Sequence, residues 1–158
     1  MIEIVVAPEE SKEQLWRLFL EYADELSELD GETRPHIKRH YSYFDQFWAD
    51  EHRTPFAILY DHEPIGFCLL EDTGTSYKIN DFYIRPLHRR RGFGVMAVER
   101  VKDHCRGLGR HTTLAANVYV NNAPAIEFWQ SAGFTDTGRR VRIRHLRLIE
   151  MECRLREP

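Results

Sequence analysis

Residues Asn80 to Gly94 read NDFYIRPLHRRRGFG. The opening letters end an apolar strand, Pro86 starts a basic loop, and two glycines lead into a helix. The N–H groups of a helix's first turn are unpaired and carry a partial positive charge, and glycine lets a phosphate approach that backbone. Arginines beside the turn add bidentate donors. The stretch therefore predicts a pyrophosphate site; the alternative is a glycine-eased turn flanked by solvated arginines.

Two other functions would use the same residues. The letters GFGVMA after Arg91 match the G-x-G-x-x-A pattern of dinucleotide-binding folds. That pattern requires a tight turn directly after the strand and an acidic residue about twenty positions on. Here the loop from Arg85 to Arg91 intervenes and Asn117 stands near the place of the acid, so we reject it. Nucleic-acid binding is also disfavoured, because the net charge is -3 and no nucleic-acid motif accompanies the arginines.

Upstream of this stretch, the sequence predicts a strand, two helices and three more strands. A β-branched run predicts a strand over Ile2 to Ala7. Steps of three and four predict a helix, ended by Asp30-Gly31, whose buried stripe is Leu15, Phe19, Tyr22, Leu26 and Leu29. A second helix is expected over Ile37 to Asp50, with a core face of Ile37, Tyr41, Phe44 and Trp48. The three strands are Pro55 to Tyr60, Ile65 to Glu71 and Tyr77 to Ile84.

Downstream, helices and strands alternate. A helix from Gly92 to Arg106 has a predicted buried stripe of Val95, Val98, Val101, Cys105 and Leu108. A strand over Thr112 to Val118 precedes a helix that Asn122 caps and Gly133 ends. Two strands follow, near Thr137 to Arg147 and Ile149 to Leu155. The order β-α-α-β-β-β-α-β-α-β-β predicts one mixed α/β domain over residues 1–158, with helices on both faces of its sheet.

Composition narrows the class of protein. The chain has 158 residues, 42% of them apolar, which suits one domain with one core. No apolar run is long enough to cross a membrane, and no signal-peptide pattern is present. Cys68, Cys105 and Cys153 are too few and too far apart to suggest disulfides or a metal site. We therefore expect a cytoplasmic protein, monomer or homodimer, with no metal, membrane or nucleic-acid partner.

Two motifs occur in a characteristic order. Arg89-x-x-Gly92-x-Gly94 follows the predicted strand, and Asn122-x-x-Ala125-Ile126-x-Phe128-Trp129-x-x-x-Gly133-Phe134 lies downstream. Together they resemble the acetyl-CoA loop and the following helix of the GNAT superfamily of N-acetyltransferases. The resemblance covers the whole chain. Within the superfamily, YFDQFW from Tyr43 and PFAI from Pro55 resemble uncharacterised bacterial predicted acetyltransferases, which indicates no substrate.

The resemblance implies where acetyl-CoA would bind, in a V between splayed fourth and fifth strands. Backbone groups of Phe82, Tyr83 and Ile84 would pair with the pantetheine arm like an added strand. The loop and first helical turn would hold the pyrophosphate, through Arg89, Arg90, Arg91, Gly92, Phe93, Gly94 and Val95. Asn122 would contact the pantetheine, and Ala125, Phe128 and Trp129 would line the groove. The alternatives are plain core packing for Phe128 and plain helix capping for Asn122.

The family's reaction is direct attack of a neutral amine on the thioester, which requires a base, an oxyanion donor and an acid. The backbone N–H of Phe82 is a candidate oxyanion donor. Trp129 stands where the family often has an acidic tyrosine, and indole is no useful acid near neutral pH. Water, Tyr83 or Tyr119 would take that role, or the thiolate would leave unaided because its pKa is only about 8.5.

The base is also absent from its usual place, because some members carry a strand glutamate where this chain has Lys78. Asp81 is the nearest carboxylate, but strand alternation predicts that it faces away from Lys78, Asn80 and Phe82. A pairing of Asp81 with an arginine or a backbone N–H is the alternative. Asn80 would only hold a water, and Glu71 is expected to lie too far along its strand.

The acceptor is expected over the first two helices and the last hairpin, where His36, His40, Tyr43 and Phe47 are available. An acidic first helix favours a cationic amine. The sequence therefore predicts an acetyl-CoA-dependent N-acetyltransferase whose partners are a coenzyme A thioester and an amine of a small molecule or peptide. The alternative is a non-catalytic acyl-CoA-binding module.

Overall fold

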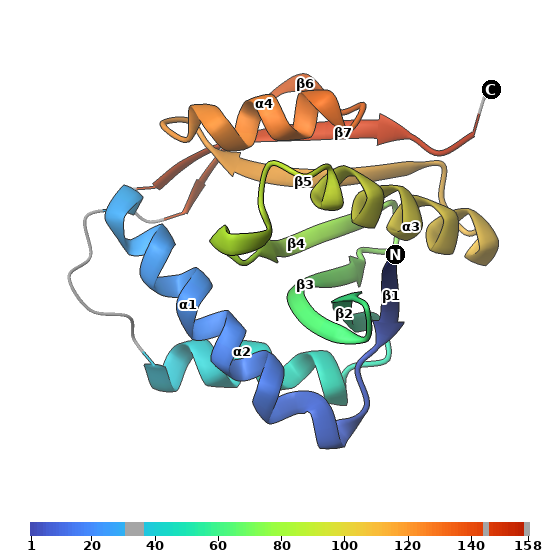
Figure 1. Cartoon of the computed structure of the whole chain (residues 1–158). Coiled ribbons are helices and arrows are strands. Elements are labelled where there is room, and N and C mark those ends of the chain that lie inside the picture. Colours follow the sequence, from blue (N-terminus) through green and yellow to red (C-terminus); the bar gives the residue numbers. More distant parts are fainter. Residues whose placement is uncertain (31–36, 144–145, 157–158) are drawn as a thin grey trace.

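A seven-stranded sheet with helices on both faces forms the body of the protein (Figure 1). The computed structural model describes residues 1–30, 37–143 and 146–156. The expected order of helices and strands is confirmed. The strands are β1 (Ile2–Val6), β2 (Arg53–Tyr60), β3 (Glu63–Asp72), β4 (Tyr77–Ile84), β5 (Thr113–Tyr119), β6 (Thr135–Ile143) and β7 (Leu146–Arg154). The helices are α1 (Lys12–Asp30), α2 (Ile37–Ala49), α3 (Phe93–Leu108) and α4 (Ala123–Ser131), with 3-10 turns η1 (Glu9–Ser11) and η2 (Pro86–His88).

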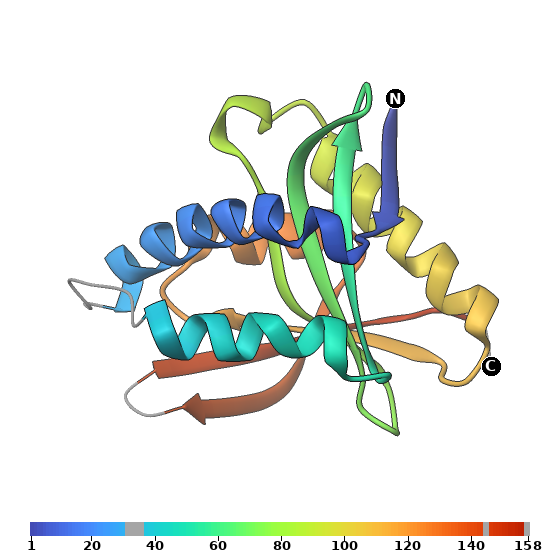
Figure 2. The same ribbon diagram turned by 90° about the horizontal axis from the view of Figure 1, so that it is seen from below.

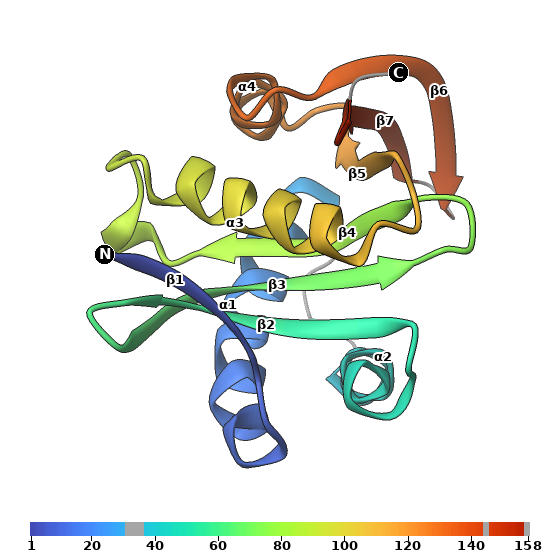
Figure 3. The same cartoon turned by 90° about the vertical axis from the view of Figure 1, so that its right-hand side faces the viewer.

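The two faces of the sheet carry different helices. α1 and α2 cover one face, and α3 lies on the other (Figures 2 and 3). One apolar cluster joins α1 and α2 to the sheet, centred on Leu15, Phe19, Phe44 and Phe67. A second cluster joins α3 and α4 to the opposite face, and it contains Val98, Val101 and Trp129. The site described below lies on the α1–α2 side.

The sheet divides between β4 and β5. The strand order is β1-β2-β3-β4-β5-β7-β6, and every neighbouring pair is antiparallel except β4 and β5, which are parallel. These two strands pair only through Tyr77 to Ile79 and Leu114 to Ala116. Beyond those residues they separate, so the expected V between the fourth and fifth strands is confirmed. The backbone edge of β4 from Asn80 onward is left without a strand partner on the β5 side.

One residue of β4 has no paired residue on β3. Glu71 pairs with Lys78 and Leu70 with Ile79, but the next pair is Leu69 with Asp81. Asn80 is therefore the extra residue of a β-bulge. Because a bulge shifts the alternation of side chains by one position, it changes which residues of β4 share a face.

The last hairpin corrects the sequence prediction. The strands expected over Thr137 to Arg147 and Ile149 to Leu155 placed the break at Leu148, whereas β6 ends at Ile143 and β7 begins at Leu146. Leu148 is buried and pairs with Tyr119 of β5. The sequence from Val141 to Leu148 contains no glycine, proline or asparagine, so it carries no turn signal.

Two helix faces were predicted correctly only in part: Phe44 in α2 and Val98, Val101 and Cys105 in α3 are buried as expected. In α2, Tyr41 is 41% exposed and Phe47 is 1% exposed, the reverse of the expectation. Aromatic residues surround this helix, so their spacing could not single out one face. In α3, Leu108 is 42% exposed, while Lys102 is buried and its ammonium donates to the Ala132 carbonyl at 2.5 Å.

Candidate active site between the splayed strands

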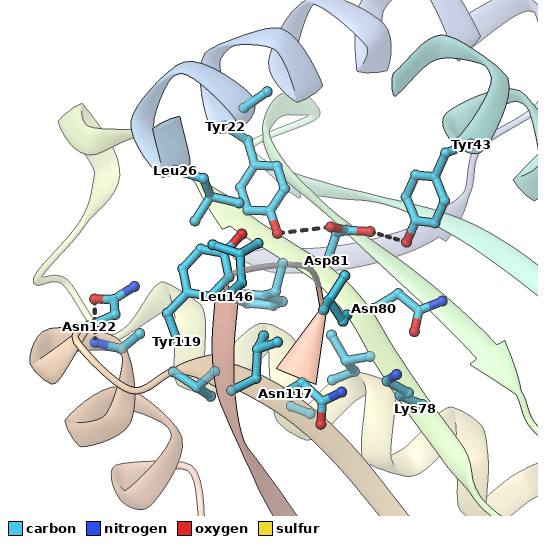
Figure 4. Close-up of a pocket in the computed structure, with 18 of the residues that line it drawn as sticks. Tyr22, Leu26, Tyr43, Lys78, Asn80, Asp81, Asn117, Tyr119, Asn122 and Leu146 are labelled. Atoms are coloured by element: carbon cyan, nitrogen blue, oxygen red, sulfur yellow. Dashed lines mark hydrogen bonds between the residues drawn. The ribbon is translucent and has the colours of Figure 1, made fainter. Parts of the chain in front are cut away.

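A cavity of about 580 Å³ opens where β4 and β5 separate. α1 and α2 form its roof, β4 and β5 its floor, and α4 and the β6–β7 hairpin one side (Figure 4). Its polar lining comprises Tyr22, Ser27, His40, Tyr43, Arg53, Glu71, Lys78, Asn80, Asp81, Asn117, Tyr119 and Asn122. Most of the predicted catalytic and pantetheine residues therefore meet here: Asn80, Asp81, Phe82, Tyr119, Asn122, Ala125 and Trp129. His36 lies outside the described residues, and Phe47 belongs to the core.

Asp81 is the focus of the cavity's hydrogen bonds. The hydroxyl of Tyr22 donates to one carboxylate oxygen at 2.8 Å, and that of Tyr43 donates to the other at 2.5 Å (Figure 4). Within residues 1–30, 37–143 and 146–156, no cationic group lies within 4.0 Å of this carboxylate. Burial raises the pKa of Asp81, against the opposing effects of the two hydroxyls and of the charges on His40 and Lys78. The partners expected for Asp81, an arginine or a backbone N–H, are replaced by two tyrosines.

The two tyrosines stay protonated. Burial raises the pKa of Tyr22 well above its ordinary value, and the charge of Asp81 adds to the effect. The same two causes raise the pKa of Tyr43. Both hydroxyls are therefore fixed donors to Asp81. Tyr22 was expected in the buried stripe of its helix, and nothing in its spacing distinguished a core tyrosine from one that supports a carboxylate.

The bulge at Asn80 overturns part of the predicted alternation. Against the prediction, Asp81 shares a face with Lys78 and Asn80. Phe82 also contributes to the lining, but its ring packs 5.5 Å from Phe128 in the cluster below α3 and α4, so it alternates with Asp81 as predicted. Asn80 donates its amide N–H to Glu71 at 2.7 Å. Glu71 is therefore part of the same site, and its expected distance along the strand was wrong. A bulge leaves no recognisable pattern in this stretch, so strand periodicity alone could not reveal it.

Asn117 is a site residue that the sequence reasoning missed. It lies on β5 directly after the last residue paired with β4, and it lines the cavity. Its carbonyl oxygen Oδ1 is buried and has no hydrogen-bond partner in the described part of the chain. Buried polar atoms are nearly always paired, so this oxygen indicates a place for a ligand donor or a water. Lys78 lies on the neighbouring strand at the same end of the cavity (Figure 4).

The basic loop before α3 has the shape of an anion site. Arg90 and Gly92 both have left-handed backbones, with φ of 63° and 80°. Gly92 caps α3, and no side chain occupies the cap. The N–H groups of a first helical turn have no partners within their helix, and consecutive N–H groups in such turns form anion-binding concavities. The geometry thus suits the pyrophosphate predicted from the sequence.

The loop arginines have specific partners. The Arg89 guanidinium forms two hydrogen bonds to Glu25 of α1, at 2.6 and 2.7 Å, and a third to the Ile84 carbonyl at 2.7 Å. Arg91 lies over the ring of Phe93 at 4.6 Å. Arg89 thus fastens the loop to α1, a role that its motif position did not suggest, while the described structure gives Arg90 no ion pair.

Glu21 and Glu25 of the acidic helix α1 do not line the cavity. Glu21 accepts a hydrogen bond from the Tyr83 hydroxyl at 3.3 Å and lies 3.4 Å from Arg85, and Glu25 is bound by Arg89. α1 lines the cavity with uncharged residues, among them Tyr22 and Leu26. Its acidity therefore gives no reason to expect a cationic acceptor, and that expectation has to rest on Asp81 instead.

α4 supplies a wall of aromatic rings. Trp129 is 7% exposed, and its ring centroid lies 4.9 to 5.6 Å from those of Phe82, Phe128 and Phe134. Asn122 caps α4, because its side chain accepts from the Ala125 N–H at 3.3 Å. The capping alternative for Asn122 is thus present alongside its place in the cavity lining. Phe128 is partly buried, packs against the core and also fills the space beside Gly94.

Two further observations concern metal binding and membrane spans. In the described residues, no cluster of three or more His, Cys, Asp or Glu side chains could hold a metal ion. Over the same residues, no helix is sufficiently long and apolar to cross a membrane. The arrangement thus offers a partly buried carboxylate, an anion-binding loop and an unpaired strand edge.

Residues 15–134 match the model of the acetyltransferase (GNAT) family. No curated protein matches the chain.

Solved structures share the fold at low identity. An acetyltransferase from Thermus thermophilus is 23% identical, with a TM-score of 0.75 over 98% of this chain and 97% of that one. The PaiA N-acetyltransferase from Thermoplasma acidophilum, in complex with coenzyme A, is 14% identical, with a TM-score of 0.75 over 98% and 99%. The spermidine N-acetyltransferase from Vibrio cholerae, in complex with CoA and spermine, is 15% identical, with a TM-score of 0.75 over 98% and 95%.

Proposed function

We propose, from the premise that this chain belongs to the acetyltransferase (GNAT) family, that it transfers an acetyl group to an aliphatic amine bound beside Asp81. As a member of that family it is an acetyl-CoA-dependent acetyltransferase. The amine, its binding site and the roles of individual residues are the substance of the proposal.

The observation that carries it is the carboxylate of Asp81. A carboxylate that is removed from water is costly unless a cation or several donors compensate it. Two tyrosine hydroxyls satisfy part of this requirement, and no cationic side chain of the described residues lies within 4.0 Å to form an ion pair with it. An alkylammonium ion would supply the missing charge and three donors. The cavity therefore suits an amine acceptor in its protonated form.

The coenzyme would lie along the V. The N–H groups from Arg90 to Val95 would hold its pyrophosphate at the start of α3. The free edge of β4 at Phe82 to Ile84 would pair with the pantetheine arm, for which the separation of β4 from β5 leaves space. Asn122, Ala125 and Trp129 would enclose the arm on the α4 side, because all three line the cavity.

The bound acetyl-CoA supplies an acyl group on a good leaving group, and the chain's residues do the rest. Asp81 takes a proton from the bound ammonium, aided by a pKa that burial has raised. The neutral nitrogen attacks the thioester carbon, while the Phe82 N–H stabilises the oxyanion. The C–S bond then breaks, and the second amine proton leaves through a water held by Asn80.

Protonation of the thiolate is the remaining step. Tyr83 is turned toward Glu21 on α1, and burial raises its pKa to about 12, so it is a poor candidate. Tyr119 lines the cavity and is the better candidate for the acid. The indole of Trp129 serves as a wall. The proposal includes a cytoplasmic location, which rests on the three unpaired cysteines.

The test is an Asp81→Asn variant with calorimetry and turnover measured on the same preparation. Coenzyme A should bind with unchanged affinity, because the loop that holds it is separate from Asp81. Turnover of aliphatic amines should fall by about 10² to 10⁴-fold, the usual worth of a general base. Tyr43→Phe is the matched control: it keeps the carboxylate and removes one donor, so it should lose less activity. Full turnover in Asp81→Asn would exclude Asp81 as the amine site.

A further inference from the structure

The cavity contains two cations as well as two carboxylates. Arg53 and Lys78 line it together with Glu71 and Asp81, so the charges of its described lining cancel. A pocket for a diamine or polyamine would need an excess of negative charge, because like charges brought close together repel. The balance instead matches an acceptor that carries one charge of each sign.

Two of the four charged groups are already engaged. Arg53 donates to Gln46 at 2.9 Å, lies 3.5 Å from the Asp50 carboxylate and stacks 5.2 Å from the Phe47 ring centroid. Glu71 accepts the amide of Asn80 at 2.7 Å. These contacts fix both side chains at the cavity wall and satisfy them in part within the protein.

The other two are Lys78 and Asp81. In the part of the chain that the structure describes, neither forms an ion pair within 4.0 Å, although both line the cavity and the bulge places them on one face of β4. Three strand residues span about 10 Å at most. A small acceptor whose amine meets Asp81 can therefore reach the ammonium of Lys78 with a group only a few carbon atoms away.

We propose that the acceptor is an amino acid or a similar amino carboxylate, whose carboxylate binds Lys78 while its amine binds Asp81. The inference rests on the proposed function and adds the class of substrate. Lys78 is then a specificity-determining residue. Its ammonium repels the second cation of a diamine, and a simple alkylamine has no carboxylate to pair with it.

The experiment compares five-carbon acceptors that differ in one group. These are 5-aminopentanoate and 2-aminopentanoate, which carry a carboxylate, pentylamine, which has none, and 1,5-diaminopentane, which has a second cation. Each is assayed for kcat/KM with the wild type and with Lys78→Gln. Because the wild-type-to-variant ratio is taken for a single acceptor, the basicity of that amine cancels.

For the better aminopentanoate, Lys78→Gln should lower kcat/KM about ten-fold more than it does for pentylamine. The difference should appear chiefly in KM, because about ten-fold is the worth of one charge-assisted hydrogen bond. Lys78→Arg should keep the preference for the carboxylate, and Lys78→Glu should shift it toward the diamine. If pentylamine or the diamine is the best wild-type acceptor, or if Lys78→Gln affects all acceptors equally, the inference is wrong. If coenzyme A binds and no amine is acetylated, the proposed function itself fails and the inference fails with it.

Discussion

Trp129 shows how one side chain can belong to the core and the site together. Its ring contacts Phe82 of β4 and Phe128 of its own helix, and part of it reaches the cavity. A ring held by three aromatic neighbours has a fixed position, which suits a wall for the pantetheine arm. It offers no proton near neutral pH, so the acid must be another group or none.

Replacement of Trp129 separates these roles. Trp129→Tyr should change turnover by less than about ten-fold, a barrier difference of about 1.4 kcal/mol, because the thiolate leaves without help from this position. Trp129→Ala should destabilise the fold by about 3–5 kcal/mol and weaken coenzyme A binding through lost apolar contact. Turnover with the best amine and calorimetry with coenzyme A measure the two effects. A rise of ten-fold or more in Trp129→Tyr would show instead that the enzyme runs without an effective acid.

Individual roles were harder to predict than positions. The sequence grouped Asp81, Asn80 and the capping residue Asn122 in one candidate site, and all three line the cavity, because motifs fix the order of residues along a chain. It did not reveal that Tyr22 and Tyr43 support Asp81, since that contact joins residues far apart in the sequence. Such contacts depend on how α1 and α2 cross the sheet, and neither helix carries a motif that specifies its placement.

At the scale of elements, the accurate predictions have strong local signals. The bounds of β4 were predicted correctly, and α4 begins after Asn122 as expected. The errors have equally local causes. The last hairpin lacks turn residues, the aromatic residues of α2 surround the helix, and the bulge in β4 reverses the alternation after Asn80. The bulge matters most, because it brings Lys78 and Asp81 to one face.

Gly94 allows close packing of α4 against α3, a role in addition to the approach of a phosphate to its backbone. A Cβ at this position would lie 2.7 Å from Cε1 of Phe128, so the glycine permits α4 to approach the start of α3. Gly94→Ala should therefore destabilise the protein by about 1–3 kcal/mol through overpacking. Urea unfolding measures this. Gly94→Ala combined with Phe128→Leu should recover part of the loss, because the two sites are in contact.

The matched control is Gly107→Ala. Gly107 lies in α3 as well, but a Cβ there meets no atom within 4 Å. The substitution should stabilise the protein by about 0.5–1 kcal/mol, because alanine loses less backbone entropy in a helix. If the two variants behave alike, the contact with Phe128 does not limit the size of residue 94.

For the molecule as a whole, the uneven distribution of charge along the sequence becomes a set of internal contacts. Acids of α1 meet arginines of the coenzyme loop, as in the pairs Glu21–Arg85 and Glu25–Arg89. These pairs join the helix that roofs the cavity to the loop that would hold the pyrophosphate. The cavity itself keeps balanced charges, with Lys78 and Asp81 left available.

Asp81 should therefore reduce the stability of the protein while it serves the reaction. Its pKa is raised in the folded state, so above the unfolded value of about 3.9 the folded protein holds the proton more tightly. By linkage, stability falls as pH rises from about 4 through the folded pKa, and the loss persists at higher pH. Asp81→Asn removes this titration. It should raise the melting temperature at pH 7, and the gain should disappear near pH 4.

Asp72 provides the opposite case in the same pair of strands. Burial opposes ionisation of this carboxylate, but hydrogen bonds from the Gly74 N–H, His111 and Arg110 outweigh it and lower its pKa to about 2. Its contribution is present above pH 3.9 and is lost as pH falls toward 2. Asp72→Asn should accordingly lower the melting temperature at pH 7. Melting curves of both variants against the wild type, from pH 4 to 8, test the pair. A lower melting temperature for Asp81→Asn at pH 7 would mean that the tyrosine hydroxyls already compensate the charge fully, and the argument for an ammonium partner would lose its basis.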